Sequence, residues 1–290
     1  MTEMNRGGTD MGETNTGGTN PDGMDLDAPS LDAATIEALA ERLEDCELQA
    51  RDTPKITLDH PRMNWADAYA VQEAIRRRKV GRGARIVGLK AGLTSFAKMR
   101  QMGVDSPIFG FLTDGFVVPD GGRCRHAELI HPKVEPELVF VTKAALAGPG
   151  CTIAEVLAAT DFVLAGIEVI DSRYRDFKFD LKSVVADNCS SSRFVVGGIM
   201  RDARELDLRT TGVVLEKNGE VVALGAGAAV LGHPANAVAM LADHLGRRGQ
   251  AIPAGTLILT GGLTEAVAVQ PGDHVALHAQ GMGCTSLTFV

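Results

Sequence analysis

The chain has 290 residues, of which 45% are hydrophobic and 4% aromatic, and its formal net charge at pH 7 is −8. This length allows one large domain or two modest ones, with enough apolar side chains for a packed core. The acidic balance excludes a typical nucleic-acid-binding protein, because binding phosphates requires clustered Lys and Arg.

The sequence contains no apolar stretch typical of a signal peptide or a membrane span, so we expect a soluble, cytoplasmic protein without membrane contact. Five cysteines are scattered along the chain without CxxC spacing. We therefore expect reduced thiols, and neither a disulfide framework nor a structural zinc site.

Residues 1–29 are rich in Gly, Thr, Asn and Asp and show no apolar periodicity, which predicts a disordered tail. Residues 30–110 are predicted to form an N-terminal helical and αβ part. In this part Ser30 could cap a helix that ends near residue 50, and Asn64 could cap a second helix. Apolar residues at helical spacing follow both caps, which indicates packing helices.

Residues 111–290 are predicted to form a β-rich body, because they contain strand-like runs such as VEPELVFV and FVLAGIEVID. Asn218-Gly219 separates two of these runs and predicts a two-residue hairpin turn. One helix interrupts the strands and is expected to begin at Pro234. The pattern as a whole predicts an α+β fold: a mixed β-rich body with a small helical N-terminal part.

Two glutamates, Glu135 and Glu137, interrupt an otherwise apolar strand one residue apart. Residues i and i+2 of a strand share a face about 7 Å apart, so this face is either open to water or holds a cation. Glu168 lies in a second apolar run, where a charge is costly to bury unless it is paired, for example with Arg173, or liganded. If the three carboxylates meet, all-oxygen ligation favours Mg²⁺ or Mn²⁺.

Two further places are candidates for substrate contact. Lys90 follows a short apolar strand between two glycines, where it is either a site residue or a solvated strand end. Asn188, Ser190 and Ser191 belong to a dense polar cluster after Asp187. This cluster suits hydrogen bonding to a carboxylate as well as it suits an elaborate turn.

The chain resembles the hydratase/decarboxylase family of aromatic meta-cleavage pathways, within the fumarylacetoacetate hydrolase superfamily. The resemblance runs in order from about residue 33 to 290 and is carried by the motifs GLKAGLTS, GVDSPIFGFL, VEPEL, GIEVIDSR, VVADNCSSS, LGHPANAVAMLADHL, ILTGGLTEAVAVQPGD and GMGCTSLTFV. It implies the β-rich body of that superfamily. It also implies Mg²⁺ or Mn²⁺ bound by Glu135, Glu137 and Glu168, with Lys90 and Asp105 lining the active site.

Two activities of that family compete. The stretch SRYRDFKFDLKSVVADN is similar to the decarboxylase form, which implies metal-dependent loss of CO₂ from 4-oxalocrotonate (2-oxohex-3-enedioate). The alternative is hydration of 2-oxopent-4-enoate, in which Asp105 would matter most as a proton donor. For decarboxylation we expect an apolar pocket around the leaving carboxylate, so Arg173, Arg175 and Lys178 are not assigned to it.

Two other readings are an acylpyruvate-type hydrolase and a non-catalytic partner subunit. The first would need a positioned base near the acidic motifs, and the second is at odds with an intact set of three glutamates beside Lys90. The resemblance further implies a small 2-oxo dicarboxylate as substrate and an oligomer, and a complex with the hydratase of the same pathway is a further expectation.

Overall fold

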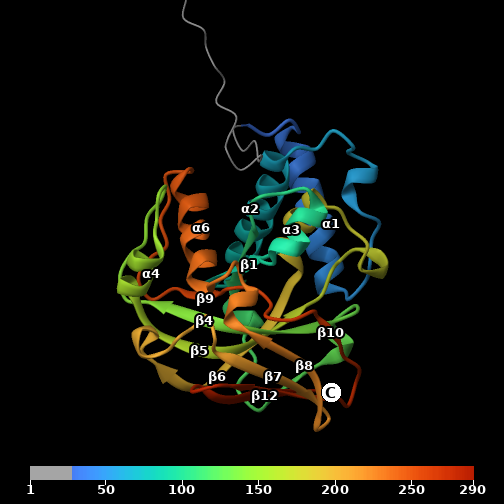
Figure 1. Ribbon diagram of the computed structural model, residues 1–290. Helices are drawn as coiled ribbons and strands as arrows, with labels where there is room; N and C mark the ends of the chain where they lie inside the picture. Colours follow the sequence, from blue (N-terminus) through green and yellow to red (C-terminus); the bar gives the residue numbers. More distant parts are fainter. Residues whose placement is uncertain (1–27) are drawn as a thin grey trace, which may run out of the picture.

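The computed structural model describes residues 28–290. Residues 1–27 of the predicted disordered tail therefore lie outside the described residues. The predicted α+β class is confirmed, with two β-sheets and a group of helices on one side of them (Figure 1). Within the described residues, no helix is both long and apolar enough to cross a membrane.

The first sheet contains seven strands in the order β2-β1-β9-β4-β5-β6, with β10 paired to β4. Its strands pair antiparallel except β1 with β9, which run parallel. The strands are β1 (Ile86–Gly92), β2 (Ile108–Thr113), β4 (Lys133–Thr142), β5 (Thr160–Ile170), β6 (Ser191–Arg201), β9 (Leu257–Leu259) and β10 (Val267–Ala268).

The second sheet has five strands in the order β3-β12-β11-β7-β8. Its two outer strands, β3 and β8, are the open edges of this sheet. The strands are β3 (Gly122–Cys124), β7 (Gly212–Lys217), β8 (Glu220–Ala226), β11 (His274–Ala279) and β12 (Gly283–Phe289).

The two sheets share one apolar core. Leu138 of β4 and Ile167 of β5 are fully buried in the same cluster as Leu277 of β11 and Leu287 of β12. Because successive strand side chains point to opposite faces, the odd-numbered residues of β4 and the even-numbered residues of β5 face away from this core. That second face of β4 and β5 is where the acidic residues emerge.

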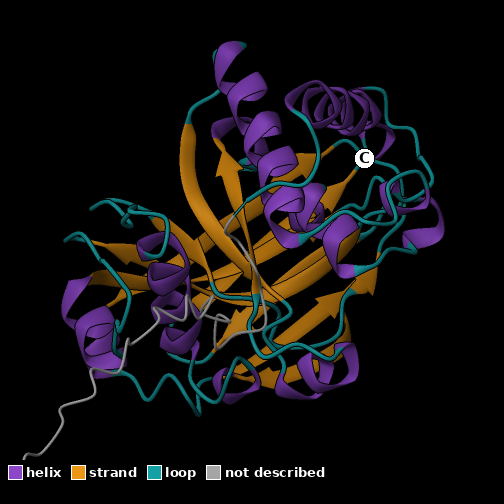
Figure 2. Ribbon diagram, turned by 90° about the horizontal axis from the view of Figure 1, so that it is seen from above, coloured by secondary structure: helices purple, strands orange, loops and turns teal. Residues whose placement is uncertain are grey.

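Most helices lie on the other side of the molecule, above the strands in Figure 1, and Figure 2, which is seen from above, shows helices around and in front of the strands. A separate buried cluster joins α1 and α2 to α5 and to β2 through residues such as Leu43, Val71, Val185 and Phe111. The helices are α1 (Ala33–Leu48), α2 (Trp65–Gly81), α3 (Phe96–Met102), α4 (Ile153–Ala159), α5 (Leu181–Ala186) and α6 (Pro234–Gly246).

Most local start and stop signals act where the sequence predicts. Asn64 caps α2 with a reciprocal capping box, α6 begins at Pro234, and Asn218-Gly219 turns between β7 and β8 with both φ angles positive. The predicted cap of the first helix was wrong. Asp32 accepts the capping hydrogen bond from Thr35, while the Ser30 hydroxyl donates to Asp67 at the start of α2.

The proposed division into parts 30–110 and 111–290 falls inside β2. Since β1 and β2 pair with each other and β1 also pairs with β9, the N-terminal part contributes two strands to the same sheet as β4 and β5. That these two parts are separate folding units remains a prediction. The strand that carries Lys90 belongs to the sheet that carries the glutamates.

Candidate metal centre

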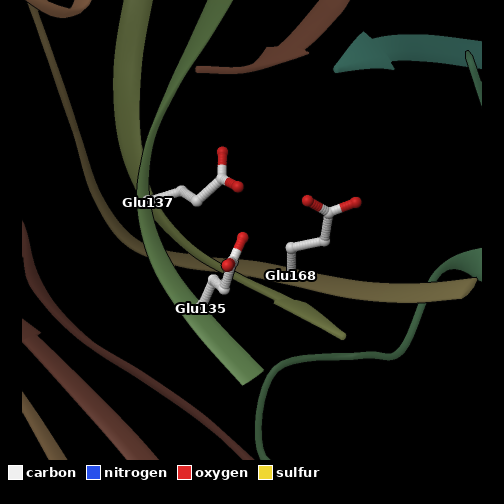
Figure 3. A group of neighbouring side chains, drawn as sticks. All are labelled: Glu135, Glu137 and Glu168. Carbon is white, nitrogen blue, oxygen red and sulfur yellow. The ribbon is translucent and has the colours of Figure 1, made fainter. Parts of the chain in front are cut away.

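The register of β4 against β5 brings the three predicted glutamates together. Glu135 pairs directly opposite Glu168, and Glu137 lies two residues further along on the same face of β4. Their carboxylates point into one space (Figure 3), and ligand oxygens of the three lie within 4.8 Å of one another. The two strands thus place three potential oxygen ligands on a paired, rigid scaffold.

The protein supplies few hydrogen bonds to offset the negative charge of these carboxylates. Glu137 and Glu168 are fully buried, and Oε1 of Glu137 and both carboxylate oxygens of Glu168 have no hydrogen-bond partner among the described residues. Burial raises the pKa of Glu135; burial and the neighbouring charge of Glu168 raise the pKa of Glu137 well above its usual value. Buried anionic oxygens without partners are costly unless a cation binds them. The donor set fits a hard divalent ion such as Mg²⁺ or Mn²⁺.

Lys90 provides a buried cation in direct contact with this cluster. It is buried on β1, and its Nζ lies 2.8 Å from Oε2 of Glu168 in an ion pair without directed hydrogen-bond geometry. Nζ also donates to the carbonyl of Cys189 at 3.1 Å. Burial alone would lower the pKa of Lys90, but the charge of Glu168, with smaller contributions from its neighbours, raises it above its usual value. With Lys90 charged and the three carboxylates ionised, two negative charges remain, which suits one divalent ion.

Two glycines after β9 let the backbone approach the cluster. The Gly261 N–H donates to Oε2 of Glu137 at 2.7 Å, and this residue has a φ of +106°, which favours glycine. A Cβ on Gly262 would lie 3.0 Å from Cδ of Glu135. The sequence prediction did not include these residues, although the GG pair directly after a short apolar strand was a usable signal.

The predicted polar cluster forms a left-handed turn. Asn188, Cys189 and Ser190 have φ angles of 47°, 54° and 58°, a conformation that non-glycine residues rarely adopt in succession. The Asn188 amide exchanges two hydrogen bonds with the backbone of Phe111, at 2.9 and 3.0 Å. The hydroxyls of Ser190 and Ser191 are buried without a partner. The turn therefore presents two free hydroxyls, while Asn188 anchors it to β2.

A buried ion pair supports this turn. Arg173 pairs with Asp187, not with Glu168, and so the alternative reading of Glu168 as a partner of Arg173 does not hold. The Arg173 guanidinium also donates to the carbonyls of Asp171 and Ser191, at 2.6 and 3.0 Å. These contacts fix both ends of the turn to the segment that follows β5.

Asp105 lies apart from this arrangement. It is exposed on the loop between α3 and β2 and lines a cavity of about 860 Å³ together with Trp65 and Asp180. None of the three glutamates lines that cavity. Of the predicted site residues, the structure brings together the glutamates and Lys90 directly, and it links the turn of residues 188–190 to Lys90 through one carbonyl.

The fold and the acidic cluster agree with a sequence match to a known family. The profile described as fumarylacetoacetate (FAA) hydrolase C-terminal matches residues 96–290, about two thirds of the chain. The chain belongs to this family, and its β-rich body has the fold of that type.

Closer relatives carry individual names. The chain is 63% identical to a 4-oxalocrotonate decarboxylase of Pseudomonas sp. (strain CF600) over 253 residues, which are 87% of this chain and 96% of the relative. It is 39% identical to a 2-keto-4-pentenoate hydratase of Burkholderia vietnamiensis (strain G4 / LMG 22486) over 252 residues, with coverage of 87% and 96%. A solved 4-oxalocrotonate decarboxylase from Pseudomonas putida G7, complexed with magnesium and adipate, superposes with a TM-score of 0.89 at 59% identity, covering 91% of this chain and all of the other.

Proposed function

We propose that this protein is a metal-dependent decarboxylase that converts 4-oxalocrotonate to 2-hydroxypenta-2,4-dienoate and CO₂. The observation that carries the proposal is the buried cluster of three glutamates beside a buried lysine, in a chain 63% identical to a decarboxylase of that name. The lower identity of 39% to a hydratase favours decarboxylation over hydration.

Glu135, Glu137 and Glu168 would hold the metal through carboxylate oxygens that lie within 4.8 Å of one another, and Glu137 and Glu168 contribute oxygens without a hydrogen-bond partner. When bound, Mg²⁺ or Mn²⁺ supplies a Lewis acid that stabilises negative charge developing on the 2-oxo oxygen of the substrate. The cluster lies on two paired strands, so the protein fixes the ligand geometry before substrate arrives.

The reaction breaks the bond between C5 and C6 of the substrate. The electron pair of that bond forms a C4=C5 double bond, the C3=C4 pair shifts to C2=C3, and the carbonyl pair moves onto oxygen. C6 leaves as CO₂, and a dienolate remains. Protonation of its oxygen gives the dienol product, and protonation of C3 gives 2-oxopent-4-enoate. Groups that stabilise the dienolate more than the reactant accelerate the step.

Lys90 suits this requirement, because its ammonium is buried and held beside Glu168 by the Cys189 carbonyl. We assign to it neutralisation of the C1 carboxylate and the developing enolate. Ser190 and Ser191 each offer an unpaired buried hydroxyl for a substrate carboxylate. Asn188 is assigned to positioning these groups, since its amide is occupied by Phe111.

Product analysis tests the proposal. Purified protein with Mg²⁺ should release CO₂ from 4-oxalocrotonate and form the dienol, and it should not form 4-hydroxy-2-oxopentanoate from 2-oxopent-4-enoate at a comparable rate. Removal of metal with EDTA should abolish the reaction, and added Mg²⁺ should restore it. Formation of 4-hydroxy-2-oxopentanoate without CO₂ release would identify a hydratase, and no turnover of either substrate would support a non-catalytic subunit.

We also propose how the protein assembles with its substrate, with further copies of itself and with another enzyme. We assign a small 2-oxo dicarboxylate as the partner of the site, an oligomeric state, and a complex with the hydratase that would consume the product. The support for an oligomer is apolar side chains that stand exposed on β8, an open sheet edge. Because the dienol is itself unstable to ketonisation, direct transfer to a bound hydratase would be chemically useful.

A further inference from the structure

One cation shares the face of β4 that carries the glutamates. Lys133 precedes Glu135 by two residues, and the alternation along the strand points Lys133, Glu135 and Glu137 to the same side. Lys133 is half-buried, and its Nζ lies 4.3 Å from the centroid of the Phe177 ring. A cation thus stands at the end of the metal cluster, held by an aromatic face.

Four cations of the neighbouring segments have carboxylate partners. Lys90 pairs with Glu168, Arg173 with Asp187, Arg175 with Asp52 and Lys178 with Asp176. Among residues 28–290, no carboxylate oxygen lies within 4.0 Å of the Lys133 ammonium. Lys98 on α3 is likewise without such a partner, but it is exposed. Lys133 is the half-buried cation of this face whose charge the protein does not pair.

The Phe177 ring has a defined place. Its backbone is left-handed, with a φ of 59°, and its ring lies 5.1 Å from the His131 ring and 5.9 Å from the Phe179 ring, measured between centroids. These aromatic neighbours fix the ring against which Lys133 rests. A cation over a ring face uses only one side of the ammonium, so its remaining N–H groups stay free to donate to a carboxylate.

The charge of Lys133 acts on the cluster without contacting it. Burial raises the pKa of the Glu135 carboxyl and Lys133 helps to lower it, although no carboxylate oxygen lies within 4.0 Å of the Lys133 ammonium among residues 28–290. Five carbon–carbon bonds of about 1.5 Å in a zigzag span roughly 6 Å between the two carboxyl carbons of a six-carbon diacid. A cation near the cluster but out of contact with it suits the far carboxylate of such a molecule.

We propose that Lys133 binds the distal carboxylate of the six-carbon substrate and selects diacids over monocarboxylates. This inference rests on the proposed function, because the distal carboxylate is the group that leaves as CO₂. A cation at that end stabilises the bound diacid at least as much as the transition state, in which this negative charge moves away. Lys133 therefore improves binding and selectivity without raising the rate of the chemical step. The pocket around the leaving carboxylate would accordingly contain one cation, whereas the sequence analysis predicts an apolar pocket there.

The test compares Lys133→Met with Lys133→Arg and with Lys143→Met, a matched loss of an exposed cation directly after the other end of β4. Kinetics with 4-oxalocrotonate are combined with calorimetric binding of adipate and of hexanoate in the presence of Mg²⁺. For Lys133→Met, KM and the Kd of adipate should rise on the order of tenfold to a hundredfold, with kcat unchanged or higher and hexanoate binding unchanged. Lys133→Arg should keep adipate binding within about threefold of the original, and Lys143→Met should behave as the original protein.

An unchanged preference for adipate over hexanoate in Lys133→Met would overturn the inference. So would equal losses for both acids, which would assign Lys133 a purely structural role against Phe177. Lys133→Gln is a second neutral variant should the Met variant fail to fold. The binding measurements also separate the two proposals. If the original protein releases no CO₂, the proposed function fails, while the ratio of adipate to hexanoate affinity still decides whether Lys133 selects diacids.

Discussion

At the glutamate cluster, the carboxylates are buried, so their ionisation depends on whether a metal ion is bound. The folded protein holds the pKa of Glu137 well above its usual value because the side chain is buried and Glu168 is close. The folded state then binds more protons than the unfolded state over the interval between the two pKa values. Stability of the metal-free protein must therefore fall as the pH rises through that interval.

We expect the melting temperature of metal-free protein to decrease as the pH rises above the ordinary glutamate pKa, and saturating Mg²⁺ to reverse the decrease. Mg²⁺ should have this effect because it replaces the protons and compensates the carboxylates. Thermal denaturation with and without EDTA measures both effects. Glu137→Gln is the control and should flatten the pH dependence while weakening Mg²⁺ binding by at least about tenfold. A pH dependence identical in Glu137→Gln and the original protein would contradict this account.

Asp105 gives a second prediction at the residue scale. Its carboxylate is exposed on a loop and lines a cavity that none of the glutamates lines. Loss of CO₂ to give the dienol needs no carbon protonation, so Asp105→Asn should leave the rate of CO₂ release within about threefold. It should instead slow ketonisation of the dienol if Asp105 donates a proton. CO₂ release and product absorbance followed in parallel distinguish these steps; a large loss of CO₂ release would place Asp105 in the decarboxylation itself.

At the scale of elements, the packing of α1 on α2 depends on one buried acid. Glu44 of α1 is 1% exposed and accepts hydrogen bonds from Arg78 at 2.8 Å and from Arg82 at 2.7 Å, both near the end of α2. Burial alone would raise the pKa of Glu44, but the hydrogen bonds from Arg82 and Arg78 lower it below its usual value. This contribution to stability is present above the ordinary glutamate pKa and is lost as the pH falls through the folded-state pKa.

Glu44→Gln should lower the free energy of unfolding by about 1 to 2 kcal/mol at pH 7, a range that allows for solvent screening of the two partly exposed guanidinium groups. Glu41→Gln is the control, because Glu41 lies 3.5 Å from the same Arg78 but its side chain is 61% exposed. Urea denaturation of both variants at pH 7 and near pH 3 measures the difference. Equal stabilities of the two variants at pH 7 would show that the buried pair contributes nothing beyond a surface pair.

The turn after α5 depends on the buried ion pair between Arg173 and Asp187. Asp187→Asn keeps the shape of the side chain but leaves Arg173 buried and unpaired, which costs about 3 to 5 kcal/mol. We expect a lower melting temperature and, at temperatures where the variant is folded, a lower kcat, because the Cys189 carbonyl that holds Lys90 lies in this turn. The control is Asp52→Asn, which removes the partner of the exposed Arg175. An Asp187→Asn enzyme with unchanged kcat would separate the turn from the site.

For the whole molecule, the open edge at β8 is the feature that bears on assembly. Val221, Val222 and Leu224 are 56%, 39% and 70% exposed on this edge strand. An apolar edge strand without cover pairs readily with another strand, and a second copy of the chain could supply the same strand in an antiparallel pair. The second sheet would then continue across the contact.

Leu224→Lys combined with Val222→Lys should convert such an oligomer to monomers, because charged side chains on an edge strand oppose pairing. Light scattering coupled to size-exclusion chromatography measures the mass, and circular dichroism checks that the fold is intact. Replacing Glu220 at the start of the same strand by Lys serves as the control for added charge alone. An oligomer of unchanged mass in the double variant would place the contact elsewhere.

The sequence by itself determined the features that depend on neighbours in the chain. The capping box of Asn64, the start of α6 at Pro234, and the hairpin at Asn218-Gly219 all follow from local backbone preferences, so they could be predicted. The shared face of Glu135 and Glu137 follows from the two-residue period of a strand. The cap of α1 was missed because Ser30 and Asp32 are both good caps, and Asp67 of α2 binds the first.

Only the tertiary structure decided which distant residues meet. The register of β4 against β5 set Glu168 opposite Glu135, and the parallel pairing of β1 with β9 brought Lys90 to the same cluster. A strand's side-chain period does not reveal its partner or its register, because both depend on packing between segments far apart in the chain. For the same reason, the approach of Gly262 to Glu135 could not be predicted from the sequence. Sequence proximity suggested Glu168 as the partner of Arg173, but in the structure Arg173 pairs with Asp187.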